Sequence, residues 1–276
     1  MNAMKKKYLL SVLVAAALLT QCGPGPSGSE TQTPANGPRT LLAIFAHPDD
    51  EATVGPVLAK YAAEGVNVYL CIATDGRLGV NAHVKIPAGD SLAAARKLEL
   101  QCAAEKLGIN PPIMFGLHDQ LKMGEGMGAL NEQLDSLRRG VKKLFTELKP
   151  DVVLTWGASG WTGHHDHRLV GSVVTEVFES QSWTKPAQLY YSAIPADRTP
   201  KETAMQLASV DKSFLTVTIA ISDADYTRSK ESWLCHKSQY TPETIENMHG
   251  MLKAAMQNTW YFQPHCCATG PRQSLF

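Results

Sequence analysis

Apolar runs and helix-like periodicities alternate along most of the chain. Short apolar or β-branched runs predict buried strands at residues 41–46, 66–74, 113–116 and 151–156. Apolar positions at helical spacing, together with strong helix formers, predict helices at residues 51–64, 91–107, 128–149 and 168–180. Strands that alternate with helices are typical of a parallel sheet covered on both faces. The pattern therefore predicts an α/β fold, a three-layer α/β/α sandwich around a Rossmann-like, mostly parallel sheet.

The last third of the chain extends this pattern. Two more strands are expected at 187–194 and 215–222, followed by helices at 223–238 and 242–257. The polar, Pro-containing loop at 195–205 is a candidate lid or substrate wall. A nucleotide-binding Rossmann domain is disfavoured, because the first strand runs into His-Pro-Asp-Asp and not into a Gly-rich phosphate loop.

The amino terminus has the plan of a secretory signal peptide. Residues 1–22 contain three lysines, an apolar stretch from Tyr8 to Leu19, and then Cys22. This ending resembles the lipoprotein box of bacterial lipoproteins, although Gln21 replaces the small residue that usually precedes such a cysteine. We expect export to the bacterial cell envelope, with membrane contact only through a lipid on Cys22. The Gly-, Pro- and Ser-rich residues 23–39 are interpreted as a flexible tether, which leaves residues 40–276 as the folded domain.

Charge and cysteine content narrow the choice of partners and sites. The whole chain has a formal charge of zero, and without the three lysines of the signal 23 bases stand against 26 acids, a net charge of −3. A nucleic-acid partner would require a basic patch, so we expect none. Cys71 and Cys102 are interpreted as core thiols. One of the adjacent pair Cys266 and Cys267 could form a disulfide in an exported protein.

Imidazole and carboxylate side chains follow two of the predicted strands. His47, Asp49 and Asp50 come directly after residues 41–46, and a second cluster at residues 164–167 follows 151–156. Ligands bind outside the carboxyl ends of strands in open α/β sheets, so both clusters should face one cleft. They could supply His47, Asp50 and a histidine to one metal ion with an open fourth position, as in catalytic zinc sites. The competing interpretations are helix capping by the aspartates and an adventitious surface metal patch.

Four motifs in one order resemble the N-acetylglucosaminyl deacetylases known as LmbE-like or PIG-L-like proteins. They are Ala-His-Pro-Asp-Asp-Glu at 46–51, Arg-x-x-Glu at 96–99, His-x-Asp-His at 164–167 and, after Lys230, His-x-Ser-Gln at 236–239. The resemblance spans residues 41 to about 240. It implies the LmbE-like form of the fold and a zinc-dependent hydrolase that removes an N-acetyl group from an N-acetylated amino sugar or sugar conjugate.

The resemblance also implies roles for the site residues. One zinc ion, or another divalent ion, would be bound by His47, Asp50 and His167. Asp49 would be the general base that accepts a proton from the attacking water. His164, ideally as a protonated imidazole, would stabilise the developing oxyanion, and Asp166 would orient a histidine ring.

The resemblance assigns substrate binding to Arg96 and Asp119, which match positions that contact sugar hydroxyls in similar deacetylases. The other interpretation of Arg96 is a helix-surface ion pair with Glu99. His236 is interpreted as a structural residue at a helix end, and Thr162 stands where some relatives have a tyrosine. Two other functions remain open: a metal-dependent hydrolase of another amide or an ester, and a non-catalytic carbohydrate-binding lipoprotein.

Overall fold

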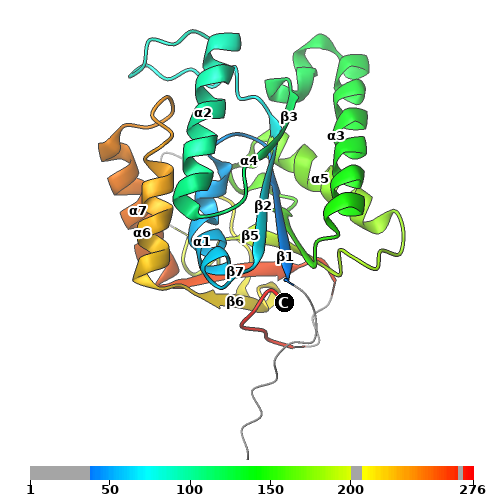
Figure 1. Cartoon of the computed structure of the whole chain (residues 1–276), viewed down its shortest axis with the longest axis vertical. Helices are drawn as coiled ribbons and strands as arrows, with labels where there is room; N and C mark the ends of the chain where they lie inside the picture. Colours follow the sequence, from blue (N-terminus) through cyan, green and yellow to red (C-terminus); the bar gives the residue numbers. More distant parts are fainter. Residues whose placement is uncertain (1–37, 200–206, 267–269) are drawn as a thin grey trace, which may run out of the picture. The chain divides into compact units, whose positions relative to one another are not determined.

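A mixed seven-stranded sheet forms the centre of the computed structural model, which describes residues 38–199, 207–266 and 270–276 (Figure 1). The strands are β1 (Thr40–Phe45), β2 (Asn67–Thr74), β3 (Ile113–Leu117), β4 (Val152–Trp156), β5 (Gln188–Ala193), β6 (Val217–Ala220) and β7 (Thr259–Pro264). Their order is β3-β2-β1-β4-β5-β7-β6. The first five are parallel, whereas β7 runs antiparallel to both β5 and β6. The predicted mostly parallel sheet is confirmed.

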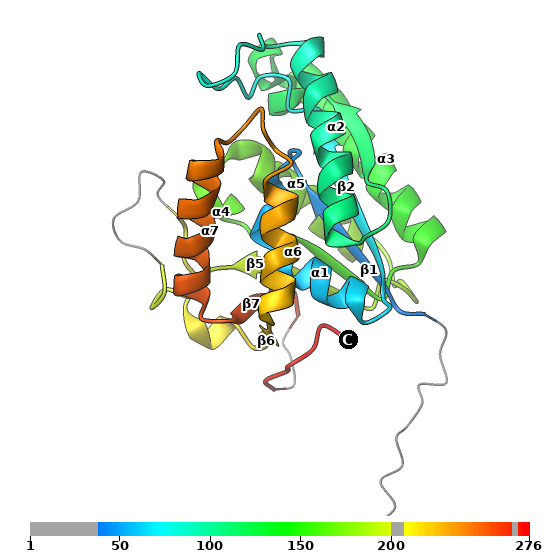
Figure 2. The same cartoon turned by 60° about the vertical axis from the view of Figure 1, so that its left-hand side comes forward.

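Helices cover both faces of the sheet (Figures 1 and 2). One face carries α1 (Gly55–Ala63), α2 (Asp90–Leu107), α6 (Asp223–Trp233) and α7 (Pro242–Met256), and the other carries α3 (Met127–Leu148) and α5 (His165–Glu179). Alternate residues of β1 point to opposite faces, so Phe45 packs in one apolar cluster and Ile44 in the other. A strand buried on both faces has no polar position, which explains the unbroken apolar run at 41–46.

Several element boundaries differ from the prediction. The helix expected at 51–64 is divided into a 3-10 turn, η1 (Asp50–Thr53), and α1. Helix α5 begins at His165, three residues earlier than expected, so Asp166 and His167 lie in its first turn. Helix α6 ends at Trp233 instead of residue 238, and strand β7 was not predicted. Its short run Thr259–Pro264 directly follows α7, without the Gly or Pro residues that usually mark a break.

The interpretation of Cys102 as a core thiol is wrong. Cys102 of α2 forms a disulfide with Cys235, which follows α6, across a Cα–Cα distance of 5.8 Å. The two cysteines are 133 positions apart, so neither helix periodicity nor a local motif indicates the pair. Cys71 is a buried thiol as predicted, and burial raises its pKa. Cys266 is exposed and forms no disulfide within the described part of the chain.

Some predictions fall on residues that the structure does not describe. The signal peptide at 1–22, nearly all of the tether at 23–39, Cys267, and residues 200–205 of the candidate lid lie outside the described residues. Within the ranges 38–199, 207–266 and 270–276, no helix is both long enough and apolar enough to cross a membrane.

Candidate functional site

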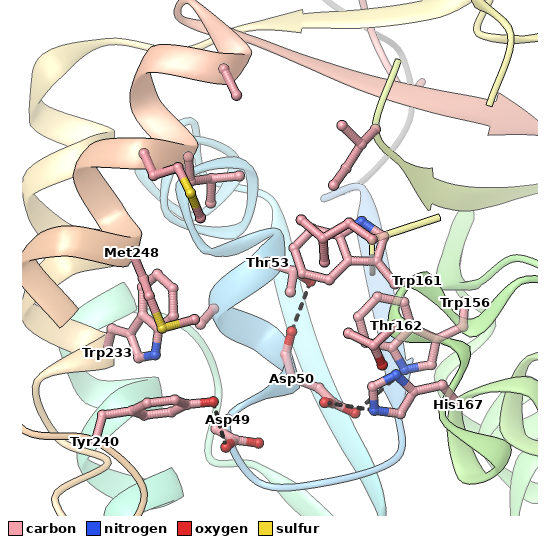
Figure 3. Close-up of a pocket in the computed structure, with 16 residues that line it drawn as sticks. Asp49, Asp50, Thr53, Trp156, Trp161, Thr162, His167, Trp233, Tyr240 and Met248 are labelled. Carbon is pink, nitrogen blue, oxygen red and sulfur yellow. Dashed lines mark hydrogen bonds and ion pairs between the residues drawn. The ribbon is translucent and has the colours of Figure 1, made fainter. Parts of the chain in front are cut away.

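The tight turn after β1 holds two neighbouring aspartates in different orientations. Asp50 Oδ2 accepts hydrogen bonds from the backbone N–H groups of Ala46 and His47, both at 2.9 Å. Asp49 has a φ of 119°, a conformation that non-glycine residues rarely adopt. Its carboxylate points toward Tyr240 whereas that of Asp50 points toward His167 (Figure 3). Backbone strain of this kind is concentrated at functional sites, where neighbouring contacts maintain it.

The second cluster lies beside this turn, because β1 and β4 are neighbours in the sheet. His47 Nδ1 is 3.3 Å from His167 Nε2, and His167 Nε2 is 3.2 Å from Asp50 Oδ1. His47 Nδ1 is also 3.7 Å from Asp50 Oδ2. The structure thus brings together the three residues that were predicted as metal ligands.

Hydrogen bonds leave one atom of each of these side chains free to bind an ion. His47 Nε2 donates to Asp166 Oδ2 at 3.0 Å, and His167 Nδ1 donates to the carbonyl oxygen of Gly160 at 2.9 Å. Asp50 Oδ2 already accepts two backbone hydrogen bonds. Among the residues that the structure describes, the remaining atoms, His47 Nδ1, His167 Nε2 and Asp50 Oδ1, form polar contacts only with one another's side chains. In a tetrahedral site with bonds of about 2.0–2.1 Å, ligand atoms are separated by roughly 3.3 Å. The two distances from His167 Nε2, 3.3 Å to His47 Nδ1 and 3.2 Å to Asp50 Oδ1, are close to this value.

The charges around this cluster also fit a divalent cation. Four carboxylates with little solvent exposure lie here, those of Asp49, Asp50, Asp119 and Asp166. The guanidinium among them is that of Arg96. A buried excess of negative charge is unfavourable unless a cation or bound protons compensate it. Accordingly, although burial opposes it, hydrogen bonds to the surrounding carboxylates raise the pKa of His47 well above its usual value.

The pKa of Asp50 shows the complementary effect. Burial acts to raise it, but His167 and His47 hold it well below the usual range, so Asp50 is a carboxylate at neutral pH. Two groupings around His47 have ligand atoms that all lie within 4.8 Å of one another: one with His164 and His167, and one with Asp119 and Asp166. Asp166 and Asp119 approach His47 at Nε2, whereas His167 and Asp50 lie at its Nδ1.

Asp166 and Asp119 therefore contact the Nε2 side of His47, a candidate metal ligand. Asp166 Oδ2 is 3.0 Å and Asp119 Oδ1 is 3.4 Å from His47 Nε2. Burial would raise the pKa of Asp119, but the hydrogen bond and charge of His47, the backbone N–H of Leu78 and the charge of Arg96 together outweigh it and lower the pKa to about 2. Carboxylates that accept the second ring N–H of a ligating histidine fix its orientation and increase its basicity. The structure places Asp166 where it can orient a ring, as expected, and that ring belongs to His47.

Asp49 is held between Arg96 and Tyr240. Arg96 Nη2 is 3.0 Å from Asp49 Oδ1. The Tyr240 hydroxyl donates to Asp49 Oδ2 at 3.1 Å (Figure 3). Burial raises the pKa of Asp49 and Arg96 lowers it, with a net increase. A carboxyl pKa moved toward neutrality suits a group that both accepts and donates a proton.

The proposed surface ion pair between Arg96 and Glu99 is not formed. Arg96 is buried and also donates to the carbonyl oxygens of Pro48 at 2.5 Å and Gly76 at 3.1 Å. Glu99 instead accepts hydrogen bonds from the backbone N–H and the hydroxyl of Ser238. The loops around residues 48 and 76 fold over the first turns of α2, which helix periodicity alone could not show.

His164 caps the amino terminus of α5. Its Nδ1 accepts a hydrogen bond from the backbone N–H of Asp166 at 3.2 Å, so the proton of the neutral ring is on Nε2. Burial and the neighbouring imidazoles lower the pKa of His164 to about 4. The lowered pKa favours the neutral ring, in which Nε2–H is the group available for donation.

Two aromatic residues at the site were not identified from the sequence. Trp156 Nε1 lies 3.4 Å from Asp50 Oδ2, and its ring stacks on His167 at a centroid distance of 4.6 Å. Tyr240 contacts Asp49 from 191 positions away. The available signals were weak: Trp156 ends the strand before the histidine cluster, and Tyr240 directly follows the motif at 236–239.

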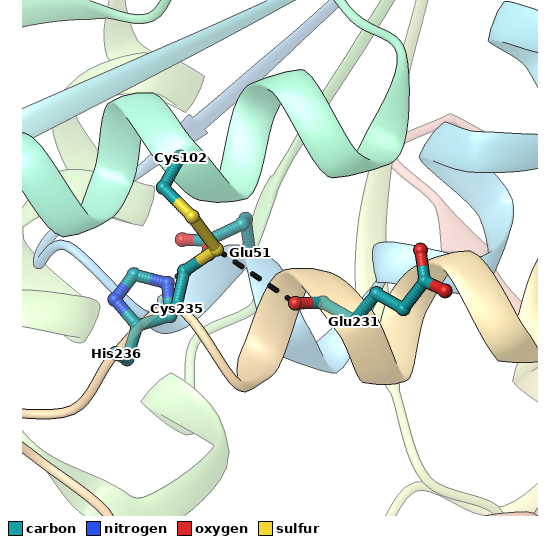
Figure 4. The surroundings of a disulfide bond; sticks show 5 residues. All are labelled: Glu51, Cys102, Glu231, Cys235 and His236. Atoms are coloured by element: carbon teal, nitrogen blue, oxygen red, sulfur yellow. Dashed lines mark hydrogen bonds and ion pairs between the residues drawn. A yellow bond between two sulfur atoms is a disulfide. The ribbon is translucent and has the colours of Figure 1, made fainter.

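A buried ion pair between Glu51 and His236 contacts the turn that contains Asp49. His236 Nε2 is 2.6 Å from Glu51 Oε1, and both side chains are fully buried. Glu51 Oε2 in turn accepts the backbone N–H of Asp49 at 3.1 Å. The disulfide at Cys235 lies immediately beside this pair (Figure 4). The contact of His236 is an ion pair with Glu51 and not the helix cap that was expected.

Two pockets meet at this site. Asp49, Asp50, His167 and Tyr240 line both of them. The first pocket, of about 300 Å³, is polar. Its other lining residues are His47, Leu78, Gly79, Arg96, Asp119, Gln120 and His164. The second pocket, of about 310 Å³, is lined mainly by apolar side chains of α7 and by tryptophans, and Thr162 lies in its wall.

The amino-acid sequence is similar to those of known deacetylases. The family model described as GlcNAc-PI de-N-acetylase, PIG-L, matches residues 42–178. A 1D-myo-inositol 2-acetamido-2-deoxy-alpha-D-glucopyranoside deacetylase from Mycobacteroides abscessus is 33% identical over 177 residues, which are 56% of this chain and 61% of that protein. The chain thus spans less than two thirds of the length of this relative.

Solved structures share the fold with low sequence identity. The N,N'-diacetylchitobiose deacetylase from Pyrococcus horikoshii is 18% identical, with a TM-score of 0.60 over 84% of this chain and 86% of that one. The 4-carboxy-2-hydroxymuconate hydratase from Pseudomonas putida is 15% identical, with a TM-score of 0.61 over 86% and 100% of the two chains. One of these proteins is a deacetylase and the other a hydratase, so the fold alone does not decide the reaction.

Proposed function

We propose that the protein is a metal-dependent N-deacetylase, because residues 42–178 match the GlcNAc-PI de-N-acetylase (PIG-L) family model. Its substrate would be an N-acetylated amino sugar or a conjugate of one. The observation that carries the proposal is the convergence of His47 Nδ1, Asp50 Oδ1 and His167 Nε2, beside an Asp49 carboxylate that is held by Arg96 and Tyr240.

We propose zinc as the cation, held by His47, Asp50 and His167. Two imidazoles and one carboxylate with further room suit a catalytic zinc site, although the same donor set also suits iron. The bound ion would act as a Lewis acid and lower the pKa of water toward neutrality. The donor spacing and the excess of buried carboxylates support a divalent ion at this position.

The protein's own groups would handle the protons. Asp49 accepts a proton from the water that attacks the amide carbon and later delivers it to the leaving nitrogen. The ion pair with Arg96 and the hydrogen bond from Tyr240 hold its two oxygens in place. His164 Nε2–H can donate to the carbonyl oxygen as that oxygen gains negative charge, which favours the transition state over the ground state.

The polar pocket is the proposed position of the sugar. Arg96 and Asp119 both line it, and so do Gly79 and Gln120. Asp119 also contacts His47, so it would couple sugar binding to the orientation of a metal ligand. Arg96 would also hold the carboxylate of Asp49 in place through their ion pair, in addition to any contact with a sugar hydroxyl.

The proposal is tested by amine release from N-acetylglucosamine and its glycosides with purified protein. We expect release that depends on added divalent metal and is lost in Asp49→Asn. The matched control is Asp135→Asn, an exposed position on α3, which should keep full activity. Metal binding without amine release from any N-acetylated sugar would overturn the proposal and favour another hydrolase substrate or a carbohydrate-binding role.

We also propose that the protein is exported and anchored through a lipid on Cys22. The signal-like residues 1–22 support export, and the Cys102–Cys235 disulfide is typical of an oxidising compartment. In a bacterial host, Cys22→Ser should move the protein from the membrane fraction to the soluble fraction. An unchanged distribution would contradict the lipid anchor.

A further inference from the structure

The apolar pocket beside Asp49 has no task in the removal of an acetyl group. It encloses about 310 Å³, at the lower end of the roughly 300–1,000 Å³ typical of small-molecule sites. An acetyl methyl group occupies about the space of one water molecule, roughly 30 Å³. Most of the pocket would therefore stay unfilled by the acyl part of an N-acetylated substrate.

The walls of this pocket are suited to a hydrocarbon chain. They include Trp161, Trp233 and Met248 (Figure 3). Met251 and Leu252 also line the pocket. Trp161 has a φ of 64°, which is unfavourable for a bulky residue, and its ring lies 5.9 Å from that of Trp156. Methionine side chains adapt to flexible apolar ligands. Met251 is 38% exposed, so this part of the pocket wall lies at the surface of α7.

The relative position of the two pockets indicates which part of a substrate enters each. Both are lined by Asp49, Asp50, His167 and Tyr240, so a scissile amide at these residues has one substituent in each pocket. The amide nitrogen carries the sugar, which matches the polar pocket with Arg96 and Asp119. The acyl carbon then directs its own substituent into the apolar pocket.

We propose that the preferred substrate is an amino sugar whose nitrogen carries a medium-length fatty acyl group instead of acetyl. This inference rests on the proposed function and specifies its substrate class. In the reaction, the oxygen of water bonds to the acyl carbon, the carbon–nitrogen bond breaks, and the nitrogen takes up the proton held by Asp49. The products are a fatty acid and the free amino sugar.

The first test compares kcat/KM for glucosamine with N-acetyl, N-butanoyl, N-hexanoyl and N-octanoyl groups, below the concentrations at which they form micelles. Burial of each methylene contributes about 0.8 kcal/mol, so kcat/KM should rise about fourfold per methylene until the pocket is filled. A kcat/KM that is highest for N-acetyl and falls with chain length would overturn the inference and leave the deacetylase proposal intact. No amine release from any member would refute both.

A second test shows whether the apolar pocket binds the acyl chain of the substrate or an apolar aglycone. The probe is the octyl β-glycoside of N-acetylglucosamine, which places a hydrocarbon chain of similar length on the other side of the sugar. We expect a smaller gain for this compound than for N-octanoylglucosamine. A larger gain for the octyl glycoside would overturn the assignment of the pocket to the acyl group.

Two adjacent alanines of α7 provide a matched pair of variants. Ala255 lines the pocket, whereas Ala254 is exposed and does not. Ala255→Phe should lower the ratio of octanoyl to acetyl kcat/KM by at least tenfold, and Ala254→Phe should leave this ratio unchanged. Equal effects of the two variants would contradict the pocket assignment, and the chain-length series with the unaltered protein remains decisive if Ala255→Phe fails to fold.

Discussion

Arg96 Nη2 lies 3.0 Å from Asp49 Oδ1, and both side chains are almost excluded from solvent. The pair joins the first turns of α2 to the strained turn after β1. Burial raises the pKa of Asp49, and the guanidinium limits that increase. The charge of Arg96 therefore sets how much of Asp49 is present as the carboxylate that can accept a proton.

Removal of this charge should change the pH dependence of the reaction. In Arg96→Met the pKa of Asp49 rises further, so the acidic limb of the kcat/KM profile moves to higher pH. We expect activity at neutral pH to fall by about 10²-fold, within the usual contribution of a general base. Arg96→Lys should recover part of the loss, and Arg139→Met on the exposed surface of α3 should have no effect. An unchanged pH profile in Arg96→Met would contradict this role.

Tyr240 donates to the other oxygen of Asp49, so Tyr240→Phe should reduce kcat and leave metal content unchanged. A hydrogen bond to a charged group contributes about 1.5–3 kcal/mol, which corresponds to a loss of about 10- to 100-fold. Tyr69→Phe, on β2, serves as the control. A loss of metal in Tyr240→Phe would instead indicate that the hydroxyl supports the ligands.

The Glu51–His236 pair should be important for stability. Removal of one partner of a fully buried pair leaves an uncompensated charge and costs about 3–5 kcal/mol. We expect His236→Ala to lower the free energy of unfolding in urea by this amount, whereas His83→Ala at an exposed position should change it little. A loss below about 1 kcal/mol would mean that the pair is replaceable.

The Cys102–Cys235 disulfide links α2 to the segment that contains His236 and Tyr240. Replacement of both cysteines by serine should lower the free energy of unfolding by about 2–5 kcal/mol, as for native disulfides in other small proteins. Treatment of the unaltered protein with dithiothreitol should give the same change. Cys266→Ser, at an exposed position, should not. Equal stability with and without dithiothreitol would contradict a structural disulfide.

The parts of the fold that could be predicted are those that depend on residues close together in the sequence. The run at 41–46 indicates a doubly buried strand, and the meeting of His47 with His167 follows from parallel strands that end at one edge. The burial of Arg96, the contact of Tyr240 with Asp49 and the pairing of Cys102 with Cys235 could not be predicted in the same way. Each depends on how distant segments pack, and residue spacing carries no information about such contacts.

The most direct test of the account is the metal content of the purified protein beside that of Asp49→Asn and His167→Ala, measured together with turnover on the best substrate. We predict about one zinc per chain in the unaltered protein. Asp49→Asn should keep the metal and lose turnover by at least about 10²-fold, since a general base contributes roughly 10²–10⁴. His167→Ala should lose both. Equal loss of metal from the two variants would contradict the division of these residues into a base and a ligand.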